Sequence, residues 1–379
     1  MSETLTSETR HDDGRPGRFG RLYQGLTTVD FVGRKKVWFT ASLVVILLGI
    51  GSLGVRGFNL GIDFKGGNSW EVLAPHSSIS AMTSAVTKAG LSNPTVTKLG
   101  SETYQVTADL NGRSTTAQTN VTNAVVNAMA KAAGVNPIQV STSSVGPTWG
   151  GQVTNRALEA LIIFFLAVVL YISLRFEPKM ALAAFIAMIH DLLVTVGVYS
   201  LFGFQITPDT VIAILTILGY SLYDTVVVFD RVRDNATGPN AILKGGTLNY
   251  SEMVNLSMNQ TLARSINTSL VAILPVLAVL VVGAYILGAT TLQDYGLALF
   301  VGLVSGAYSS IFIASPLLAW LKEREPRYQE LAARVARTQH STLSPRDAAL
   351  LGSDATQRLA GSRRSVSTLT PRARKQKRR

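Results

Sequence analysis

The sequence predicts a membrane protein: an all-α six-helix transmembrane bundle with one small α+β domain of the ferredoxin-like βαββαβ type between the first and second spans. Charged residues make up only 15% of the 379 residues and hydrophobic residues 47%, whereas about 25% of an ordinary soluble domain is charged. Six stretches are also nearly free of charge and long enough to cross about 30 Å of hydrocarbon. Between the first two of these stretches, residues 56–155 show the alternating patterns of a small folded domain.

The six spans are placed on the apolar stretches themselves. Asp191 and Asp224 bring a carboxylate into the third and fourth stretches, while Arg156 and Glu159 lie at the outer edge of the second. The predicted spans cover residues 37–55, 156–174, 180–202, 210–230, 265–287 and 295–321.

The distribution of Lys and Arg predicts how the spans are oriented. Residues 1–36 carry seven of these cations and residues 322–379 carry fifteen, whereas residues 56–155 carry six. The short connections at 203–209 and 288–294 carry none. Cytoplasmic segments next to membrane helices are enriched in Lys and Arg. Both termini and the loop at 231–264 are therefore predicted to be cytoplasmic, and residues 56–155 extracytoplasmic.

The two terminal segments have the composition of disordered chain. Residues 1–36 are predicted to be partly disordered, and residues 322–379 mostly so, because they are rich in Ser, Thr, Arg and Ala from about Arg327 onward. The net charge of +12 favours contact of these basic flanks with anionic lipid of the bilayer. No nucleic-acid partner is expected.

The extracytoplasmic segment is predicted to fold as one domain with the order β-α-β-β-α-β, which is the ferredoxin-like plan. Period-two alternation indicates strands and helical spacing indicates two amphipathic helices. The expected elements are a strand with a glycine turn in 59–74, a helix at 78–90, strands at 95–99 and 104–110, a helix at 114–134 and a strand at 137–146. The domain carries no nucleophile, metal or cofactor constellation, so we expect it to contact another protein rather than to act as an enzyme.

Asp224 is the residue that points most directly to a function. It lies fourteen residues into the fourth span, about 21 Å along the helix. A charged side chain at a span centre costs about 2.5–3.5 kcal/mol on insertion scales, so such residues face a bundle interior and serve a function. Arg264 stands at the cytoplasmic mouth of the fifth span and can extend toward a carboxylate. Because burial raises a carboxyl pKa and a nearby Arg lowers it, the pair predicts a proton relay. The alternative is a static ion pair that joins two spans.

Polar residues within a turn of these charged residues are predicted to support the site. By helical spacing they share a face with Asp224, Asp191 or Arg264. They are Tyr220, Ser221, Thr195, Asn267 and Thr268. Asp191 itself stays an open candidate for proton coupling. Its neighbour His190 points about 100° away around the helix, and is expected to meet backbone or lipid rather than to pair with Asp191.

Four motifs in this order resemble the SecD/SecF family of bacterial protein-export membrane proteins, in particular its SecF branch, over approximately residues 25–325. The family is related to the proton-driven resistance-nodulation-division exporters. The motifs are GIDFKGG at 61–67, GYSLYDTVVVFDRVRDN at 219–235, QTLARSINTS at 260–269 and GLVSGAYSSIFIASPLL at 302–318. The residues that belong to the glycine-rich motifs are Gly61, Asp63, Gly66, Gly67, Gly302 and Gly306.

The resemblance implies an auxiliary subunit of the Sec translocon in the cytoplasmic membrane. It implies a heterodimer with SecD, association with the SecYEG channel, YajC as an open candidate partner, and a translocating unfolded polypeptide as the cargo. In that family the proton-motive force assists late steps of export, and the fourth-span Asp and fifth-span Arg couple the protons. By motif these residues correspond to Asp224 and Arg264.

Two other functions remain open from the sequence. A stand-alone proton-driven exporter of small molecules or lipids would use the same intramembrane charges, but needs a second six-span half. An intramembrane aspartyl protease would use Asp191 and Asp224 as carboxylates that share a proton. That reading lacks the glycine directly before a second Asp, and Arg264 would hold Asp224 ionised.

Overall fold

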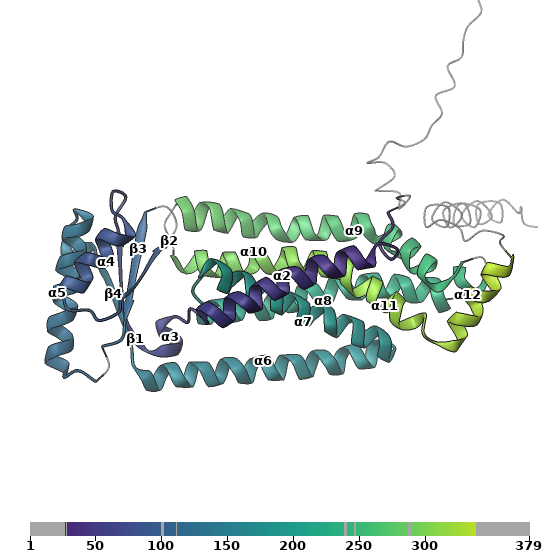
Figure 1. The fold of residues 1–379 in the computed structure, drawn as a ribbon, viewed down its shortest axis with the longest axis horizontal. Helices are drawn as coiled ribbons and strands as arrows, with labels where there is room; N and C mark the ends of the chain where they lie inside the picture. Colours follow the sequence, from purple (N-terminus) through teal and green to yellow (C-terminus); the bar gives the residue numbers. More distant parts are fainter. Residues whose placement is uncertain are drawn as a thin grey trace, which may run out of the picture.

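The computed structural model describes residues 27, 29–99, 102–110, 112–238, 241–245, 248–286 and 290–338. It forms a long helical bundle with a small sheet-containing domain at one end (Figure 1). We call this domain the outer domain, because it is the segment predicted to be extracytoplasmic. Six helical segments are long and apolar enough to cross a membrane, which confirms the predicted number of spans and the all-α bundle. The predicted disorder of the first 21 residues and of the tail beyond Thr338 lies outside the described residues.

The spans are formed by α2 and by α6 to α11, and several of them extend beyond the predicted bounds. The bounds are α2 Lys35–Arg56, α6 Pro147–Arg175, α7 Pro178–Phe202, α8 Pro208–Thr237, α9 Tyr250–Ala278 with the π segment η3 Val279–Ile286, and α10 Thr290–Ser309 with the π segment η4 Ser310–Ala314 and α11 Ser315–Lys322. α9 begins at Tyr250 rather than after Arg264, because Asn249 and Glu252 form a capping box there. Much of the predicted loop at 231–264 is therefore helix.

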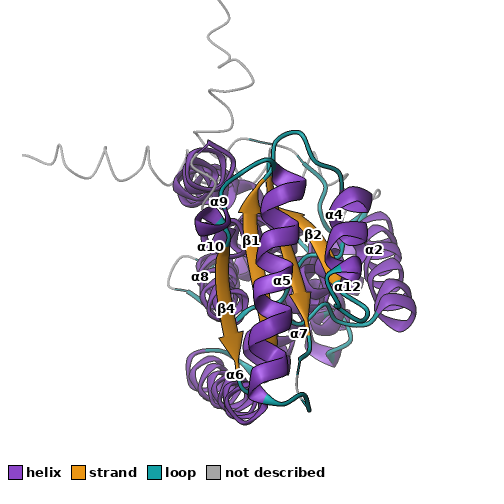
Figure 2. Ribbon diagram, turned by 90° about the vertical axis from the view of Figure 1, so that its left-hand side faces the viewer, coloured by secondary structure: helices purple, strands orange, loops and turns teal. Residues whose placement is uncertain are grey.

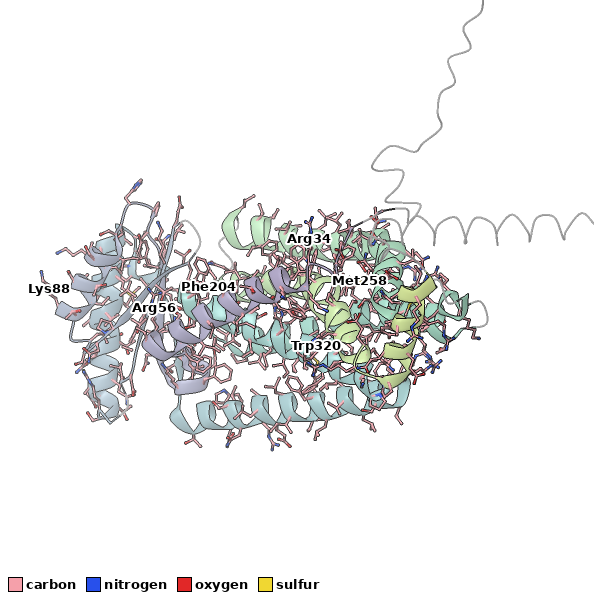
Figure 3. The ribbon with its side chains drawn as sticks, turned by 45° about the vertical axis from the view of Figure 1, so that its right-hand side comes forward. Arg34, Arg56, Lys88, Phe204, Met258 and Trp320 are labelled. Atoms are coloured by element: carbon pink, nitrogen blue, oxygen red, sulfur yellow. The ribbon has the colours of Figure 1, made fainter. Side chains whose placement is uncertain are left out.

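Helix α2 runs along the bundle. Arg34 and Arg56 lie at its opposite ends in Figure 3, and Lys88 lies at the far end of the sheet-containing domain. Arg56 donates through Nη1 to the carbonyl of Leu201 at 2.8 Å, which ties the C-terminal end of α2 to the C-terminal end of α7.

Small residues allow the central helices to approach closely. Gly49 of α2 and Gly197 of α7 face each other, and a Cβ on Gly49 would lie 2.6 Å from the Gly197 Cα. Gly302 and Gly306 of α10 face α8, where a Cβ on Gly306 would lie 2.9 Å from the Ser221 Cβ. The helix-packing role of this small-xxx-small pair brings the polar face of α10 against α8.

The outer domain follows the predicted order of elements. Its strands form one antiparallel sheet in the order β2-β3-β1-β4. Viewed from the domain end, α4 and α5 lie in front of this sheet (Figure 2). Trp70, Met82, Val106 and Met129 are fully buried between them. The elements are β1 Gly67–Leu73, α4 Ile79–Lys88, β2 Thr95–Leu99, β3 Thr103–Ala108, α5 Thr115–Ala133, η1 Pro137–Gln139 and β4 Ser141–Val145.

The glycine-rich motif does not contain the strand that was predicted before its turn. Residues Ile62–Lys65 form the short helix α3, and β1 begins only at Gly67. Gly66 ends α3 with φ +74° and Gly67 follows with φ +128°, values that favour glycine. A Cβ on Gly150, at the start of α6, would lie 2.7 Å from the Phe64 carbonyl oxygen. Similarly, residues 137–139 form a 3-10 turn before the last strand.

The predicted disorder from about Arg327 onward is wrong for its first part, because Pro326–Thr338 forms helix α12. Its Tyr328 is buried and packs on Tyr250 of α9, with ring centroids 4.4 Å apart. Glu325, just before the helix, pairs with Lys179 at 3.1 Å and Lys322 at 3.2 Å. Burial opposes the effect, but hydrogen bonds from these two lysines lower the pKa of Glu325. An apolar face and an ion cluster therefore hold the helix against the bundle.

The contact between α10 and α8 gives a prediction for stability. We expect Gly306→Ala to lower the melting temperature of the detergent-solubilised protein, since the added methyl group meets the Cβ and backbone of Ser221 and overpacking costs about 1–3 kcal/mol. Gly219→Ala on α8 is the control, because its methyl group would enter open space and Ala favours helix over Gly by about 1 kcal/mol. A thermal melt in which Gly306→Ala is as stable as Gly219→Ala would contradict this account of the packing.

Candidate functional site

Asp224 lies inside the bundle on α8, with a side chain that is 2% exposed. Ser310, at the start of the π segment that follows α10, donates a hydrogen bond from Oγ to Asp224 Oδ2. The buried hydroxyl of Ser265 on α9 lies close to the carboxylate without a hydrogen bond of normal geometry. Among the described residues, no cation pairs with Asp224, so hydroxyl groups alone meet this carboxylate.

Asp191 is a second carboxylate of the same kind and is more deeply enclosed. Its side chain on α7 is 0% exposed. Ser305 donates to Oδ1 at 2.8 Å, Ser309 donates to Oδ2 at 2.7 Å, and Ser221 donates to Oδ2 as well. His190 Nδ1 lies 3.2 Å from Oδ1. Three hydroxyls and an imidazole therefore surround this carboxylate within the membrane bundle.

One helix supplies hydroxyls to both carboxylates. Ser305 and Ser309 are one turn apart on α10 and face Asp191, whereas Ser310 points to Asp224. The helix widens to π geometry from Ser310 to Ala314, just before Pro316, whose ring lacks the N–H that would continue the ladder. π-bulges of this kind are frequent at functional sites. Sequence reasoning missed these serines, although the spacing of four between Ser305 and Ser309 indicates a shared helical face.

The supporting residues predicted by helical spacing have different partners from those expected. Ser221 shares a face with Asp224 but donates to Asp191. The Tyr220 hydroxyl is buried without a partner in the described part of the chain. Thr195 donates to the backbone carbonyl of Asp191 at 2.8 Å, not to its carboxylate.

The prediction that His190 would avoid Asp191 is wrong. The two side chains lie on the same side of α7 as α10, where Tyr308 stacks on the imidazole with ring centroids 6.1 Å apart. Adjacent helical residues differ by about 100° in direction, but a ring nitrogen and a carboxylate oxygen can still meet across that angle when both turn toward the same neighbouring helix.

Arg264 is not paired with Asp224 in this conformation. Its side chain is exposed on α9 and forms no ion pair or hydrogen bond with any residue that the structure describes. The static ion pair considered from the sequence is therefore not formed. Asn267 is also exposed, and Thr268 donates to the carbonyls of Arg264 and Ser265 at 3.0 Å. The neighbouring residue Ser265, not Arg264, faces Asp224.

The glycine-rich motif lies at the root of the outer domain. Gly61 N–H donates to the carbonyl of Ile206 at 2.8 Å, and Ile206 N–H donates to the carbonyl of Asn59 at 2.8 Å. These bonds join the motif to the connection between α7 and α8. Burial raises the pKa of Asp63; a backbone hydrogen bond at Asp63 opposes this rise and the charge of Asp209 adds to it. Among the described residues there is no cluster of three His, Cys, Asp or Glu that could hold a metal ion.

Comparison with known families decides the relationship of the chain. The family described as "Protein export membrane protein SecD/SecF, C-terminal" matches residues 125–324, and the "SecD/SecF GG Motif" matches residues 51–69. The chain belongs to the SecD/SecF family. This confirms the resemblance that the four sequence motifs indicate, and it identifies the chain as a multi-pass membrane protein.

Several curated members of the SecD/SecF family are similar along most of this chain. The protein translocase subunit SecF of Streptomyces coelicolor is 43% identical over 316 residues, which are 83% of this chain and 82% of that protein. SecF of Mycobacterium tuberculosis is 39% identical over 343 residues, covering 89% of this chain and 76% of that protein.

A solved structure of the SecD/SecF family has the same fold. The crystal structure of SecDF from Thermus thermophilus, described as a translocon-associated membrane protein, matches with a TM-score of 0.67 and 31% identity. The match covers 78% of this chain and 39% of the SecDF chain. This chain therefore spans well under half of the SecDF protein.

The serine cradle around Asp191 gives a prediction for stability. We expect Ser309→Ala to destabilise the protein, because hydrogen bonds to a charged group contribute about 1.5–3 kcal/mol and the carboxylate would lose one donor. Ser84→Ala on the exposed face of α4 is the matched control, with an expected change within about 0.5 kcal/mol. Thermal unfolding in detergent measures both, and equal melting temperatures for the two variants would show that Ser309 contributes nothing.

Proposed function

We propose that this chain is a SecF-type auxiliary subunit of the Sec translocon that, together with SecD, couples the proton-motive force to late steps of protein export. Support comes from the curated relatives, whose name is protein translocase subunit SecF, and from the translocon association stated for SecDF. Both termini are cytoplasmic in this proposal, as the Lys and Arg distribution predicts. Its role is mechanical coupling rather than enzyme catalysis.

The observation that carries the proposal is the surroundings of Asp224. Inside the membrane bundle, this carboxylate is met by hydroxyl groups and not by a cation. A serine hydroxyl can donate to an ionised carboxylate and accept from a protonated one. Asp224 can therefore bind and release a proton without leaving an unpaired donor. A neighbouring Arg would instead favour only the ionised form. Because Arg264 faces outward on α9, Asp224 has, among the described residues, no cation beside it that would hold it in the ionised form.

A small rearrangement of α9 would bring the Arg264 cation to Asp224 and favour the ionised carboxylate. Ser265 faces Asp224, and Arg264 is the preceding residue, so the two directions differ by about 100° around the helix. A rotation of α9 about its axis, or an extension of the Arg264 side chain, brings the guanidinium toward Asp224. The positive charge then causes Asp224 to release its proton. Each charge that crosses 100 mV supplies about 2.3 kcal/mol. Repeated protonation of Asp224 from the outside, followed by release of the proton to the cytoplasm, therefore drives the cycle of movements that assists export.

The motion reaches the outer domain through its root. The bonds of Gly61 and Asn59 to Ile206 connect the glycine-rich motif to the outer ends of α7 and α8, the two helices that carry Asp191 and Asp224. We propose that the outer domain is of the ferredoxin-like type, in accord with its element order and strand order, and that it contacts the emerging unfolded polypeptide.

The exposed side of α9 supports SecD as the partner. Arg264 and Asn267 share this side with the exposed apolar residues Leu270, Val271 and Leu274. A cation at this depth needs a polar partner, and spans of a second subunit would supply it. SecYEG is the channel that the pair would serve, with YajC as a further candidate partner.

The proton relay predicts that Asp224→Asn and Arg264→Ala each abolish export that depends on a proton gradient, because one loses the titrating group and the other the cation that releases its proton. Proteoliposomes with SecD, SecYEG and the ATP-driven motor measure completion of export with and without the gradient. Asp230→Asn, at the next carboxylate along α8, keeps activity, since Asp230 pairs with Arg175 at 3.1 Å near the membrane edge.

Gradient-dependent export that persists in Asp224→Asn would refute the relay. Purification in mild detergent separates the remaining alternatives. SecD should accompany the chain in every variant, whereas a stable homo-oligomer without SecD would favour the stand-alone exporter. Peptide cleavage retained in Arg264→Ala and lost in Asp191→Asn would instead favour the intramembrane protease. In the structure, no hydrogen bond joins the described carboxyl groups of Asp191 and Asp224.

A further inference from the structure

We propose that His190 and Asp191 form a second proton-binding site, which exchanges protons through an adjoining cavity between α2, α7 and α10. This inference rests on the proposed function and deepens it, because it assigns the relay two proton sites rather than one. The observations that carry it are the orientation of the imidazole, the cavity beside it and the serines that link it to Asp224.

The imidazole is held in an orientation that leaves one nitrogen free to accept a proton. His190 is 7% exposed, and its Nδ1 faces Asp191 Oδ1 at 3.2 Å. Because an ionised Asp191 only accepts hydrogen bonds, we assign the proton of the neutral ring to Nδ1. Nε2 then carries a lone pair, and it is buried without a partner among the described residues. A buried unsatisfied polar group costs about 1–3 kcal/mol, which a proton carrier entering the cavity would relieve.

A cavity of about 440 Å³ lies beside the imidazole, between α2, α7 and α10. The surface of the cavity is almost entirely apolar, although Ser42 and Tyr308 are among its lining residues. Ser42 Oγ donates to the Tyr308 hydroxyl at 3.3 Å, which donates to the Trp38 carbonyl at 3.1 Å. Trp38 lies in the first turn of α2, beside the basic residues 34–36. These hydroxyls lie at the level of His190, and the rest of the lining, including Val198 and Phe300, extends from there toward the Arg56 end of α2.

The proton step is balanced within the pair. A proton from water adds to the Nε2 lone pair, and the Nδ1 proton passes to Asp191 Oδ1. The pair then contains a neutral imidazole protonated at Nε2 and a neutral carboxylic acid, which is one proton more than before. The three serines of the cradle keep their hydrogen bonds in both states, since a hydroxyl can donate or accept.

Asp224 is close enough to sense this change through consecutive serines. Ser309 bonds Asp191 and Ser310 bonds Asp224, so a change of charge at one carboxylate alters the hydroxyl beside the other. Interacting groups of this kind titrate as a coupled pair.

Few other ionisable groups face His190. From the elements that pack on α7, the titratable groups near mid-bundle are Tyr308 of α10 and Tyr220, Tyr223 and Asp224 of α8. The other described charged residues of these elements lie toward the helix ends, at Lys35, Lys36, Arg56, Arg156, Glu159, Arg175, Asp209, Asp230, Arg231, Arg233, Asp234, Asp294 and Lys322.

The test compares His190→Asn with the wild type and with Asp224→Asn in the reconstituted complex with SecD and SecYEG. Asn can still donate to Asp191 but cannot bind a proton, so a merely structural His190 would be replaced without loss. We expect His190→Asn to reduce gradient-driven export by roughly tenfold at its pH optimum, equivalent to about 1.4 kcal/mol, and to flatten the pH profile. If His190→Asn had the wild-type export rate and pH profile while Asp224→Asn was inactive, the proposal would be overturned. If both variants kept gradient-dependent export, the proposed function would be overturned as well.

A second measurement does not depend on export. Nitrogen NMR of histidine-labelled complex follows the His190 ring, and the signal that is missing in His190→Asn identifies it among the four histidines. As the pH falls, we expect the ring proton to move from Nδ1 to Nε2 while the ring stays neutral, with a midpoint that moves in Asp224→Asn. A ring that keeps its proton on Nδ1 at every pH tested, or a midpoint unaffected by Asp224→Asn, contradicts the proposal. SecD co-purification verifies that each variant is assembled.

Discussion

The structure depends on how two buried carboxylates are stabilised without a cation. Asp191 and Asp224 are almost fully enclosed by the bundle, and serine hydroxyls meet both. An arginine partner would stabilise only the anion, and a fully apolar site only the neutral acid. Hydroxyls support both forms, because each can donate or accept a hydrogen bond. We therefore propose that the bundle is built to let the charge of these residues change.

The packing of the bundle follows from this arrangement. Short serine side chains reach the carboxylates only if α10 lies close to α7 and α8, and Gly302 and Gly306 allow that approach. The π segment at Ser310–Ala314 lets consecutive serines serve different acids. The outer ends of α7 and α8 meet the glycine-rich motif through Ile206. One set of close contacts thus connects the buried acids to the base of the outer domain.

Much of this fold can be predicted from the sequence, because the signals are local. Apolar stretches place the spans, and period-two alternation places the strands. Ser114 and Gly134, which cap the two ends of α5, place that helix. Asp224 stands out because it interrupts an apolar stretch. The serine partners of Asp191 do not stand out in the sequence. Ser305 and Ser309 lie over a hundred positions away from it, and serine is common in packed spans. The contact between His190 and Asp191 depends on tertiary packing, which turns both toward α10. Helix α12 was missed because its stability comes from contacts such as Tyr328 on Tyr250.

The most direct test of the account is the protonation state of Asp224 during export. Infrared difference spectra of the membrane-embedded complex, with a proton gradient switched on and off, report the carbonyl stretch of protonated carboxyl groups. Subtraction of the Asp224→Asn spectrum isolates this residue. We predict that the Asp224 band appears and disappears as the gradient is applied and collapsed. A band that is constant, or constantly absent, under both conditions would mean that the buried acid has only a structural role.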